Sequence, residues 1–230
     1  MLTKTKGLTG NQLKILAMVL MTVDHVGYLL LWQYLILRYI GRLSMPIFAW
    51  MIAEGCQYTK NRPRHILTIA AVAAVCQGVY WVADNSLDQC ILVTFTLSVG
   101  LIYGMDYARE KKNAFSACVM GAVFAAVCCI CLVLPEKLPG FKVDYGFFGV
   151  MLPVAIYLGR TKEEKLLLAG CCMVGIVMHL GPIQWYSFLS LPLLYLYNGE
   201  RGRLRLKYLF YLYYPLHLAA LYGISMLINS

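Results

Sequence analysis

An aspartate and a histidine, Asp24 and His25, stand side by side inside the apolar run LMTVDHVGYLL. A neutral imidazole can accept or donate a proton near neutral pH, which suits a general base. A charged side chain at the centre of a bilayer costs about 2.5–3.5 kcal/mol, so ionisable residues that remain there usually face the protein interior and often carry function. The meaning of this pair therefore depends on whether its segment lies in water or in lipid.

The composition indicates a protein with several membrane spans. Of 230 residues, 60% are hydrophobic and 13% are charged, whereas a soluble domain carries about 25% charged residues. Apolar runs recur along the whole length, each near the ~20 residues that cross a bilayer. The first run begins beside three lysines, Lys4, Lys6 and Lys14, as in a signal peptide. It contains Asp24 and His25 and no small-residue cleavage site, so we expect a retained helix.

Nine helices are predicted in a single domain, 1–230, and the fold class is an all-α polytopic membrane helical bundle. The expected spans are 13–33, 39–57, 65–83, 91–108, 114–134, 146–160, 166–180, 183–198 and 208–228. A cytoplasmic N-terminus puts sixteen of the twenty Lys and Arg residues on the cytoplasmic side, as the positive-inside rule requires. The four others are Lys137, Lys142, Arg38 and Arg42. Topology thus explains the net charge of +9, and we expect no nucleic-acid partner.

We expect no metal site. The nine cysteines nearly all fall inside spans, where they behave as small apolar residues. Cys128, Cys129 and Cys131 are closely spaced, but they lack the paired second half of a zinc site.

Two histidines from different helices are expected at a similar depth. His25 lies roughly 18 Å and His217 ~14 Å from the cytoplasmic end of its helix, at 1.5 Å per residue. One interpretation is acid–base chemistry near the middle of the membrane, and the other is a histidine that bonds a carbonyl and packs two helices together.

Asp24 and His25 cannot point the same way, since neighbours on a helix diverge by about 100°. We expect Asp24 to bond a cation from helix 39–57 or a tyrosine, and so to anchor the first helix. Arg38 and Arg42 are one turn apart on one face. They either pair with Asp144, or recognise an acceptor and stabilise developing negative charge.

We assign no catalytic or binding role to the remaining ionisable residues in or near the apolar segments. Glu54 is expected to be a structural partner for Lys or Arg. Asp106 and His179 lie near helix ends, and His65 lies in a basic loop.

Five phrases follow one another along the chain. They are LKILAMVLMTVDHVG at 13–27, IGRLSMPIFAWMIAEG at 40–55, TFTLSVG at 94–100, DYGFFGVMLPVAIYLGR at 144–160 and YYPLHL at 213–218. In this order they resemble the TraX family of integral membrane proteins, which is named for the conjugation protein associated with acetylation of the pilin N-terminus. The resemblance covers nearly the whole chain.

The resemblance implies acyl transfer. The TraX family is similar to a wider group of transmembrane acyltransferases, which move an acyl group from cytoplasmic acyl-CoA to an acceptor, often across the membrane. In that group a histidine in an early helix and arginines in a nearby helix are implicated. The matching positions are His25 in the DH phrase, Arg38 and Arg42 in RYIGR, and His217 in YPLH.

The function expected from this resemblance is a membrane-embedded acetyltransferase of the bacterial plasma (inner) membrane, with acetyl-CoA as donor and an amine or hydroxyl as acceptor. The residues assigned to catalysis are His25, Asp24, Arg42 and His217, and those assigned to acyl-CoA are Arg38, Lys60, Arg62, Arg64 and Tyr214. A second basic segment with Arg201, Arg203, Arg205 and Lys207 could also hold the CoA phosphates. The alternative for both basic segments is simple orientation charge.

Two other classes stay open. A small-molecule or proton-coupled transporter would also use Asp, His and Arg inside the membrane, but it predicts Gly- or Pro-broken helices in paired halves, and the prolines are scattered. A membrane scaffold explains the buried pair worst. The acceptor, the acyl chain length, N- versus O-acylation, transfer across the membrane and the oligomeric state also stay open.

Overall fold

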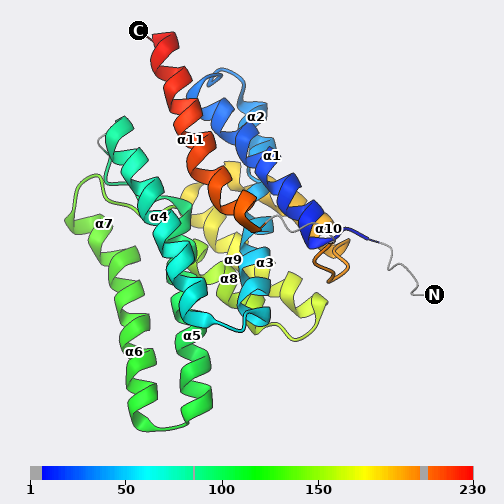
Figure 1. Ribbon diagram of the computed structural model, residues 1–230, viewed down its shortest axis with the longest axis vertical. Coiled ribbons are helices and arrows are strands. Elements are labelled where there is room, and N and C mark those ends of the chain that lie inside the picture. The colour runs from blue at the N-terminus through cyan, green and yellow to red at the C-terminus, as the bar shows by residue number, and fades with distance from the viewer. Residues whose placement is uncertain (1–6, 85, 203–206, 230) are drawn as a thin grey trace.

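The computed structural model describes residues 7–84, 86–202 and 207–229, and within them helices joined by short connections make up the fold (Figure 1). No strand occurs in these ranges, where two isolated bridges join Leu8 to Tyr197 and Gln89 to Val143. The α-helices are α1 Gly10–Leu29, α2 Leu35–Gly41, α3 Ser44–Tyr58, α4 Arg62–Asp84, α5 Ile91–Lys111, α6 Ala114–Cys128, α7 Leu134–Lys137, α8 Gly146–Leu158, α9 Lys162–Leu180, α10 Ser190–Tyr195 and α11 Lys207–Asn229. A π-helical turn, η1 Cys129–Val133, and a 3₁₀-helix, η2 Pro182–Leu189, complete the chain. The predicted all-α class is confirmed.

Four helical segments of the described chain are long and apolar enough to cross a membrane by length and composition: Leu35–Tyr58, Arg62–Val82, Ile91–Lys111 and Ala114–Lys137. Gly146–Leu158 and Leu212–Ile228 are apolar but shorter. All nine predicted spans overlap helical structure, yet three of them are not single α-helices.

A proline lies in or next to each of these three irregular segments. Span 39–57 is broken between α2 and α3 at Arg42, which is the residue four before Pro46, where a proline ring clashes with the helical carbonyl. Span 114–134 passes through the π-helical turn η1 into α7, and Pro135 follows directly. Span 183–198 is a 3₁₀-helix that begins at Pro182 and leads into the short α10.

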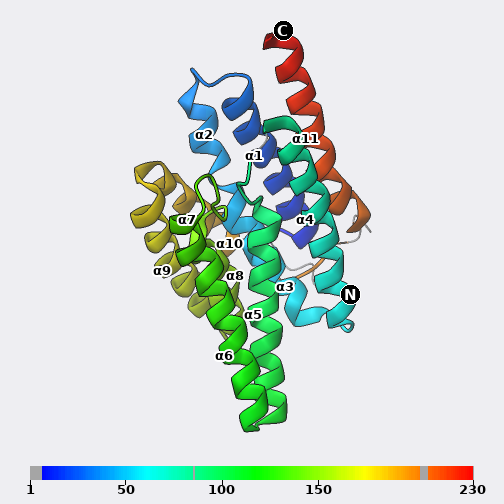
Figure 2. The same ribbon diagram turned by 90° about the vertical axis from the view of Figure 1, so that its left-hand side faces the viewer.

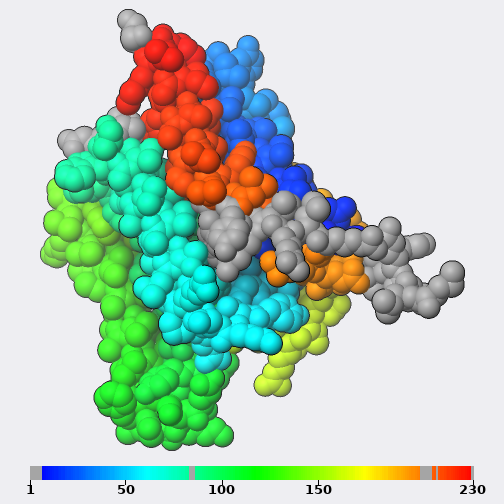
Figure 3. Space-filling model, in the orientation of Figure 1, coloured from blue at the N-terminus to red at the C-terminus, as the bar shows by residue number. Residues whose placement is uncertain are grey.

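The helices pack into two connected cores. One lies between α1, α3, α8, α9 and α11 around Trp50, Leu152 and Leu218, and the other lies between α5, α6 and α8 around Val99, Ile102 and Val150. Figures 1 and 2 both show α5 and α6 side by side and extending past the other helices at the lower end. Figure 3 shows the face on which α4 and α11 lie side by side. Both helices expose large apolar side chains, among them Val82 of α4 and Leu216 of α11.

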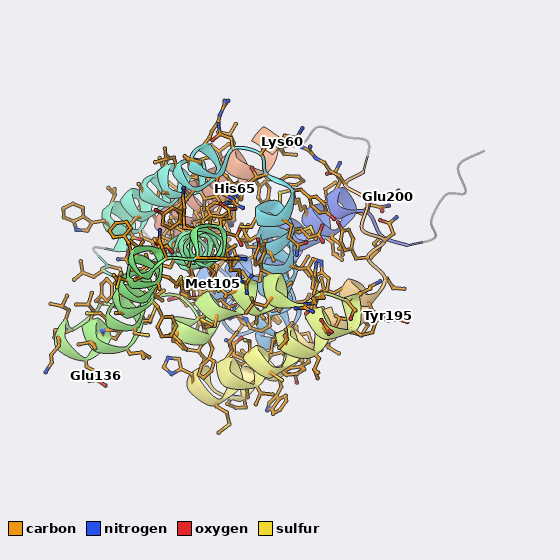
Figure 4. All side chains as sticks on the ribbon, turned by 90° about the horizontal axis from the view of Figure 1, so that it is seen from below. Lys60, His65, Met105, Glu136, Tyr195 and Glu200 are labelled. Atoms are coloured by element: carbon orange, nitrogen blue, oxygen red, sulfur yellow. The ribbon has the colours of Figure 1, made fainter. Side chains whose placement is uncertain are left out.

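The lower end of the molecule gathers several basic connections, and we call it the basic end. It contains the α3–α4, α5–α6 and α8–α9 connections and the segment 195–201 (Figure 4). Residues 8–11 are tied to 196–201 by backbone hydrogen bonds of 2.8–3.0 Å. The α1–α2 and α4–α5 connections and the end of α11 lie at the opposite end (Figure 1).

A polar group near the basic end joins α4, α5 and α8. Asp106 is 8% exposed. Its two carboxylate oxygens accept hydrogen bonds of 3.0 and 2.8 Å from the Tyr157 hydroxyl, and the carboxylate forms an ion pair of 3.2 Å with Arg62. Arg62 also pairs with Glu110 at 2.7 Å. Glu54 of α3 lies 3.9 Å from Lys165 of α9, so its expected role as a structural partner of a lysine is confirmed.

Candidate functional site

Two glycines allow α2 to pack closely on α1. A Cβ atom on Gly41 would overlap the Asp24 side chain, and one on Gly27 would lie 2.7 Å from the Cβ of Leu37. Distances below 3.0 Å require a shift of one partner, so glycine at both positions lets the carboxylate of α1 reach the residues of α2. The phrases DHVG and IGR therefore meet in space.

Asp24 receives two guanidinium groups from this junction. Arg38 donates to Asp24 Oδ2 at 2.8 Å and to the Asp24 carbonyl oxygen at 3.2 Å. Arg42 donates to the same Oδ2 and, at 3.2 Å, to the hydroxyl of Tyr145, the residue directly before α8. The prediction that Asp24 bonds a cation from the second span is confirmed. The alternative partner, Asp144, forms no ion pair with either arginine in the described chain.

The cluster of Asp24, Arg38 and Arg42 is buried and carries an excess positive charge. The side chains of Asp24 and Arg42 are 12% and 8% exposed, and that of Arg38 is 23% exposed. Oδ1 of Asp24 and Nε of Arg42 are buried without a hydrogen-bond partner in the described chain. A buried charge is tolerated only when it is paired. Because the Asp24 carboxylate pairs with both arginines, it joins α1 to α2.

The two histidines lie in contact. The ring centroids of His25 on α1 and His217 on α11 are 5.1 Å apart, with an angle of 73° between the planes. The expectation that the two helices bring these histidines to a similar level of the bundle is confirmed.

Both histidines use the same nitrogen for the helix backbone. His25 Nδ1 lies 2.9 Å from the Met21 carbonyl oxygen, and His217 Nδ1 lies 2.9 Å from that of Tyr213. A carbonyl oxygen only accepts, so each neutral ring carries its proton on Nδ1 and leaves a lone pair on Nε2. The Nε2 atom of His217 is buried and has no partner within the described residues. Each Nε2 is thus an available proton acceptor or nucleophile.

Tyrosines hold His217 in place. The Tyr213 ring stacks on His217 at 5.2 Å, with an 11° angle between the planes, and Tyr214 packs edge-on at 5.3 Å. The Tyr213 hydroxyl is 2.5 Å from the Thr22 hydroxyl of α1. The Tyr213–Thr22 contact joins α11 to α1 beside the histidine pair.

A cavity of about 660 Å³ leads from the basic end toward these tyrosines, a volume within the range of ligand sites, about 300–1,000 Å³. Its outer part is lined by the cations Lys14, Lys60 and Arg201, and its deeper part by Tyr213, Tyr214 and Met21. From Gly10 to Met21 it follows α1 for roughly 16 Å, at 1.5 Å per residue.

The histidines continue the faces that line this cavity. Lys14, Met18 and Met21 line it, and His25 follows at the same spacing of three or four residues, which is one face of a helix. On α11 Phe210, Tyr213 and Tyr214 line it, and His217 follows likewise. Neither histidine is among the lining residues, so Met21 and the tyrosines separate the rings from the cavity.

The structure divides the residues assigned to acyl-CoA into three groups. Lys60 and Tyr214 line the cavity. Arg62 is paired with two carboxylates, and neither it nor Arg64 lines the cavity. Arg38 lies with Asp24 at the far end of α3, a helix of 15 residues and thus roughly 22 Å long. Of the second basic segment, Arg201 lines the cavity, Arg203 and Arg205 lie outside the described residues, and nothing is described of the Lys207 side chain.

Sequence reasoning missed Lys14 and Tyr145, whereas Arg201 was among the basic residues considered for the CoA phosphates. Lys14 was counted as orientation charge, although its spacing from His25 already put both on one face of the helix. Its ammonium lies 5.2 Å from the Phe210 ring centroid. Tyr145 carries no such signal, because only the packing of α8 against α3 brings its hydroxyl to Arg42.

These features define a polytopic helical membrane protein with an ionisable site inside its bundle. The sequence profile of the TraX family, described as "TraX protein", matches residues 9–225, and the chain belongs to this family. It is similar to "Probable fimbrial assembly protein FimC, serogroup H1" of Dichelobacter nodosus, at 28% identity over 95% of this chain and 96% of the relative. It is also similar to "Uncharacterized protein RP591" of Rickettsia prowazekii (strain Madrid E), at 27% identity over 71% of this chain and 60% of the relative. No solved structure matches the chain.

Proposed function

We propose that the protein is a membrane-embedded acyltransferase that moves an acyl group, acetyl in the first instance, from acyl-CoA to an amine or hydroxyl. One observation carries the proposal. Two histidines with available Nε2 lone pairs lie one helical turn beyond a cavity whose outer part is cationic. The imidazoles suit proton transfer, and the cations suit a phosphorylated donor.

The residues of the cavity fit acyl-CoA chemically. Lys14, Lys60 and Arg201 offer cations to the phosphates at the outer part. The deeper lining is mostly apolar and includes Met18, Phe95 and others, which suits the uncharged arm that carries the thioester. The donor supplies the activated acyl group when it is bound.

His25 is the general base in this proposal. Its Nε2 takes the proton of the acceptor amine or hydroxyl while the acceptor atom bonds to the thioester carbonyl carbon. The carbon–sulfur bond then breaks, and the imidazolium returns its proton to the departing sulfur, so that CoA leaves as the thiol. His217, in contact with His25, provides a second imidazole that can stabilise this charge. Asp24 and its two arginines position α1, and with it His25.

We further propose nine membrane passes, a cytoplasmic N-terminus and the bacterial plasma membrane as location. Support comes from the connections at the basic end, which all fall on one side in the predicted topology. Exposed aromatic side chains at the opposite end, Trp32, Tyr34 and Trp185 among them, suit a membrane–water interface. The name of the Dichelobacter nodosus relative makes a subunit of a surface filament the first acceptor to test.

The test measures acetyl-CoA binding by calorimetry and release of CoA by chromatography, using full-length protein purified in detergent. His25→Ala is expected to keep binding and to lose CoA release by about 10²–10⁴-fold, the usual contribution of a positioned acid–base group. His179→Ala is the matched control, because His179 is exposed on α9, does not line the cavity and has no role in the proposed chemistry. A folded wild-type protein that binds no acetyl-CoA would refute the acyltransferase, and the transporter would then be tested.

A further inference from the structure

A second recess adjoins the cavity at the basic end, and we call it the α9 recess. It has a volume of about 600 Å³ and lies between α3, the start of α9 and residues 195–199. Glu54, Tyr197 and Gly199 line both the recess and the cavity. Tyr195, labelled in Figure 4, belongs to the recess and lies at this same end of the molecule. A ligand in the cavity can therefore extend into the α9 recess without crossing a helix.

The α9 recess has cationic groups with unused donors. Arg160 lines it, and the guanidinium of Arg160 makes no ion pair or hydrogen bond with the described residues. Lys162 gives one hydrogen bond of 2.8 Å to the Tyr197 carbonyl oxygen, which leaves two of its three donors. Lys165 is already occupied by Gln57 at 3.1 Å and by Glu54. Glu54 and Glu163 also line the recess, but neither forms an ion pair with Arg160 or Lys162 among the described residues. Arg160 and Lys162 thus remain for an anion.

The α9 recess also has aromatic surface and a buried donor without an acceptor. Trp50 lines it and is 2% exposed, and its indole N–H has no partner in the described chain. Tyr195 is 60% exposed, and its ring lies 4.9 Å from the Lys162 ammonium. Aromatic faces stack on nucleobases, and a guanidinium matches a phosphate with two parallel hydrogen bonds.

We propose that the α9 recess binds the adenosine 3′-phosphate end of CoA, with Arg160 and Lys162 on the phosphate, while the cavity takes the diphosphate and the thioester arm. This inference rests on the proposed function. A phosphate monoester carries close to two negative charges at neutral pH, so it gains most from two cations that lack carboxylate partners. Lys60 and Arg201, in the cavity, then serve the diphosphate.

The test compares CoA with 3′-dephospho-CoA by calorimetry on full-length protein in detergent. Wild-type protein is expected to bind CoA about tenfold more tightly, the effect of one charge-assisted hydrogen bond at an accessible site. Arg160→Gln is expected to lower the affinity for CoA by about tenfold and to change the affinity for 3′-dephospho-CoA by no more than about twofold. Lys162→Gln is the second variant, and it is also expected to lower the affinity for CoA more than that for 3′-dephospho-CoA. Lys60→Gln is expected to lower the affinities for both ligands alike.

Lys137→Gln is the control, since Lys137 is an exposed cation at the opposite end, and it should change neither affinity. Equal wild-type affinities for the two ligands, or equal losses of both in Arg160→Gln, would overturn the assignment of the α9 recess and leave the acyltransferase intact. An Arg160→Gln effect confined to binding of phosphatidylglycerol vesicles would overturn it too, in favour of a lipid headgroup. Wild-type protein that binds neither nucleotide would refute the proposed function itself.

Discussion

Removing the Asp24 carboxylate should destabilise the fold through the arginine that is left buried. Breaking a buried ion pair by deleting one partner costs about 3–5 kcal/mol. Arg42 is 8% exposed and cannot turn to water, whereas Arg38 is 23% exposed and can. At roughly 2–4 °C per kcal/mol for a chain of this size, Asp24→Ala should lower the melting temperature by roughly 6–20 °C.

The double variant Asp24→Ala/Arg42→Ala isolates the cause. It removes the stranded charge together with the carboxylate, so it should melt above the Asp24→Ala single variant, with a coupling of at least about 1 kcal/mol. Unfolding can be followed with a thiol-reactive dye once the exposed Cys118, Cys129 and Cys171 have been blocked, because Cys56, Cys76 and Cys90 are buried in the native state.

Asp88→Ala is the matched control. Asp88 pairs with Lys142 at 3.1 Å, but their side chains are 35% and 72% exposed, so its loss should cost no more than about 1 kcal/mol. Asp24→Ala melting as high as Asp88→Ala would refute the reasoning, as would a double variant that melts below both of its single variants.

Three further variants test the packing and the cavity. Gly41→Ala should lower the melting temperature and impair CoA release, because its methyl group overlaps Asp24; Gly78→Ala on α4 has nothing within 4 Å and should be neutral by both assays. Asp106→Asn should cost about 1–3 kcal/mol in thermal unfolding, since this buried carboxylate serves a tyrosine and an arginine; an unchanged melting temperature would contradict that role. Met18→Trp should fill the cavity and raise the acetyl-CoA dissociation constant more than tenfold in calorimetry, whereas Val19→Trp, at a position 54% exposed, should leave it unchanged.

Much of the helical pattern could be predicted because it depends on local composition. Apolar runs near twenty residues are interrupted by basic or Gly- and Pro-containing segments. The ends predicted from them lie within a few residues of the observed ends of α1, α4, α5 and α11. The break at Arg42 and the 3₁₀-helix η2 were not predicted as such, although a proline is present at each. A proline shows that a helix is disturbed, while the neighbouring helices decide whether it kinks, breaks or changes pitch.

Three features of the candidate site could be predicted from the sequence alone. They are the different directions of the Asp24 and His25 side chains, the shared face of Arg38 and Arg42, and the similar depth of His25 and His217. Each follows from the rise and twist of one helix at a time. Only the tertiary structure decided that both arginines meet Asp24, that the two histidine rings touch, and that their Nδ1 atoms are occupied by backbone carbonyls. It also decided which cations line the cavity and which, like Arg62, are paired elsewhere. The physical reason is that helix periodicity states which way a side chain points, whereas the rotation and crossing of neighbouring helices, set by close contacts such as Gly41 against Asp24, determine what it meets.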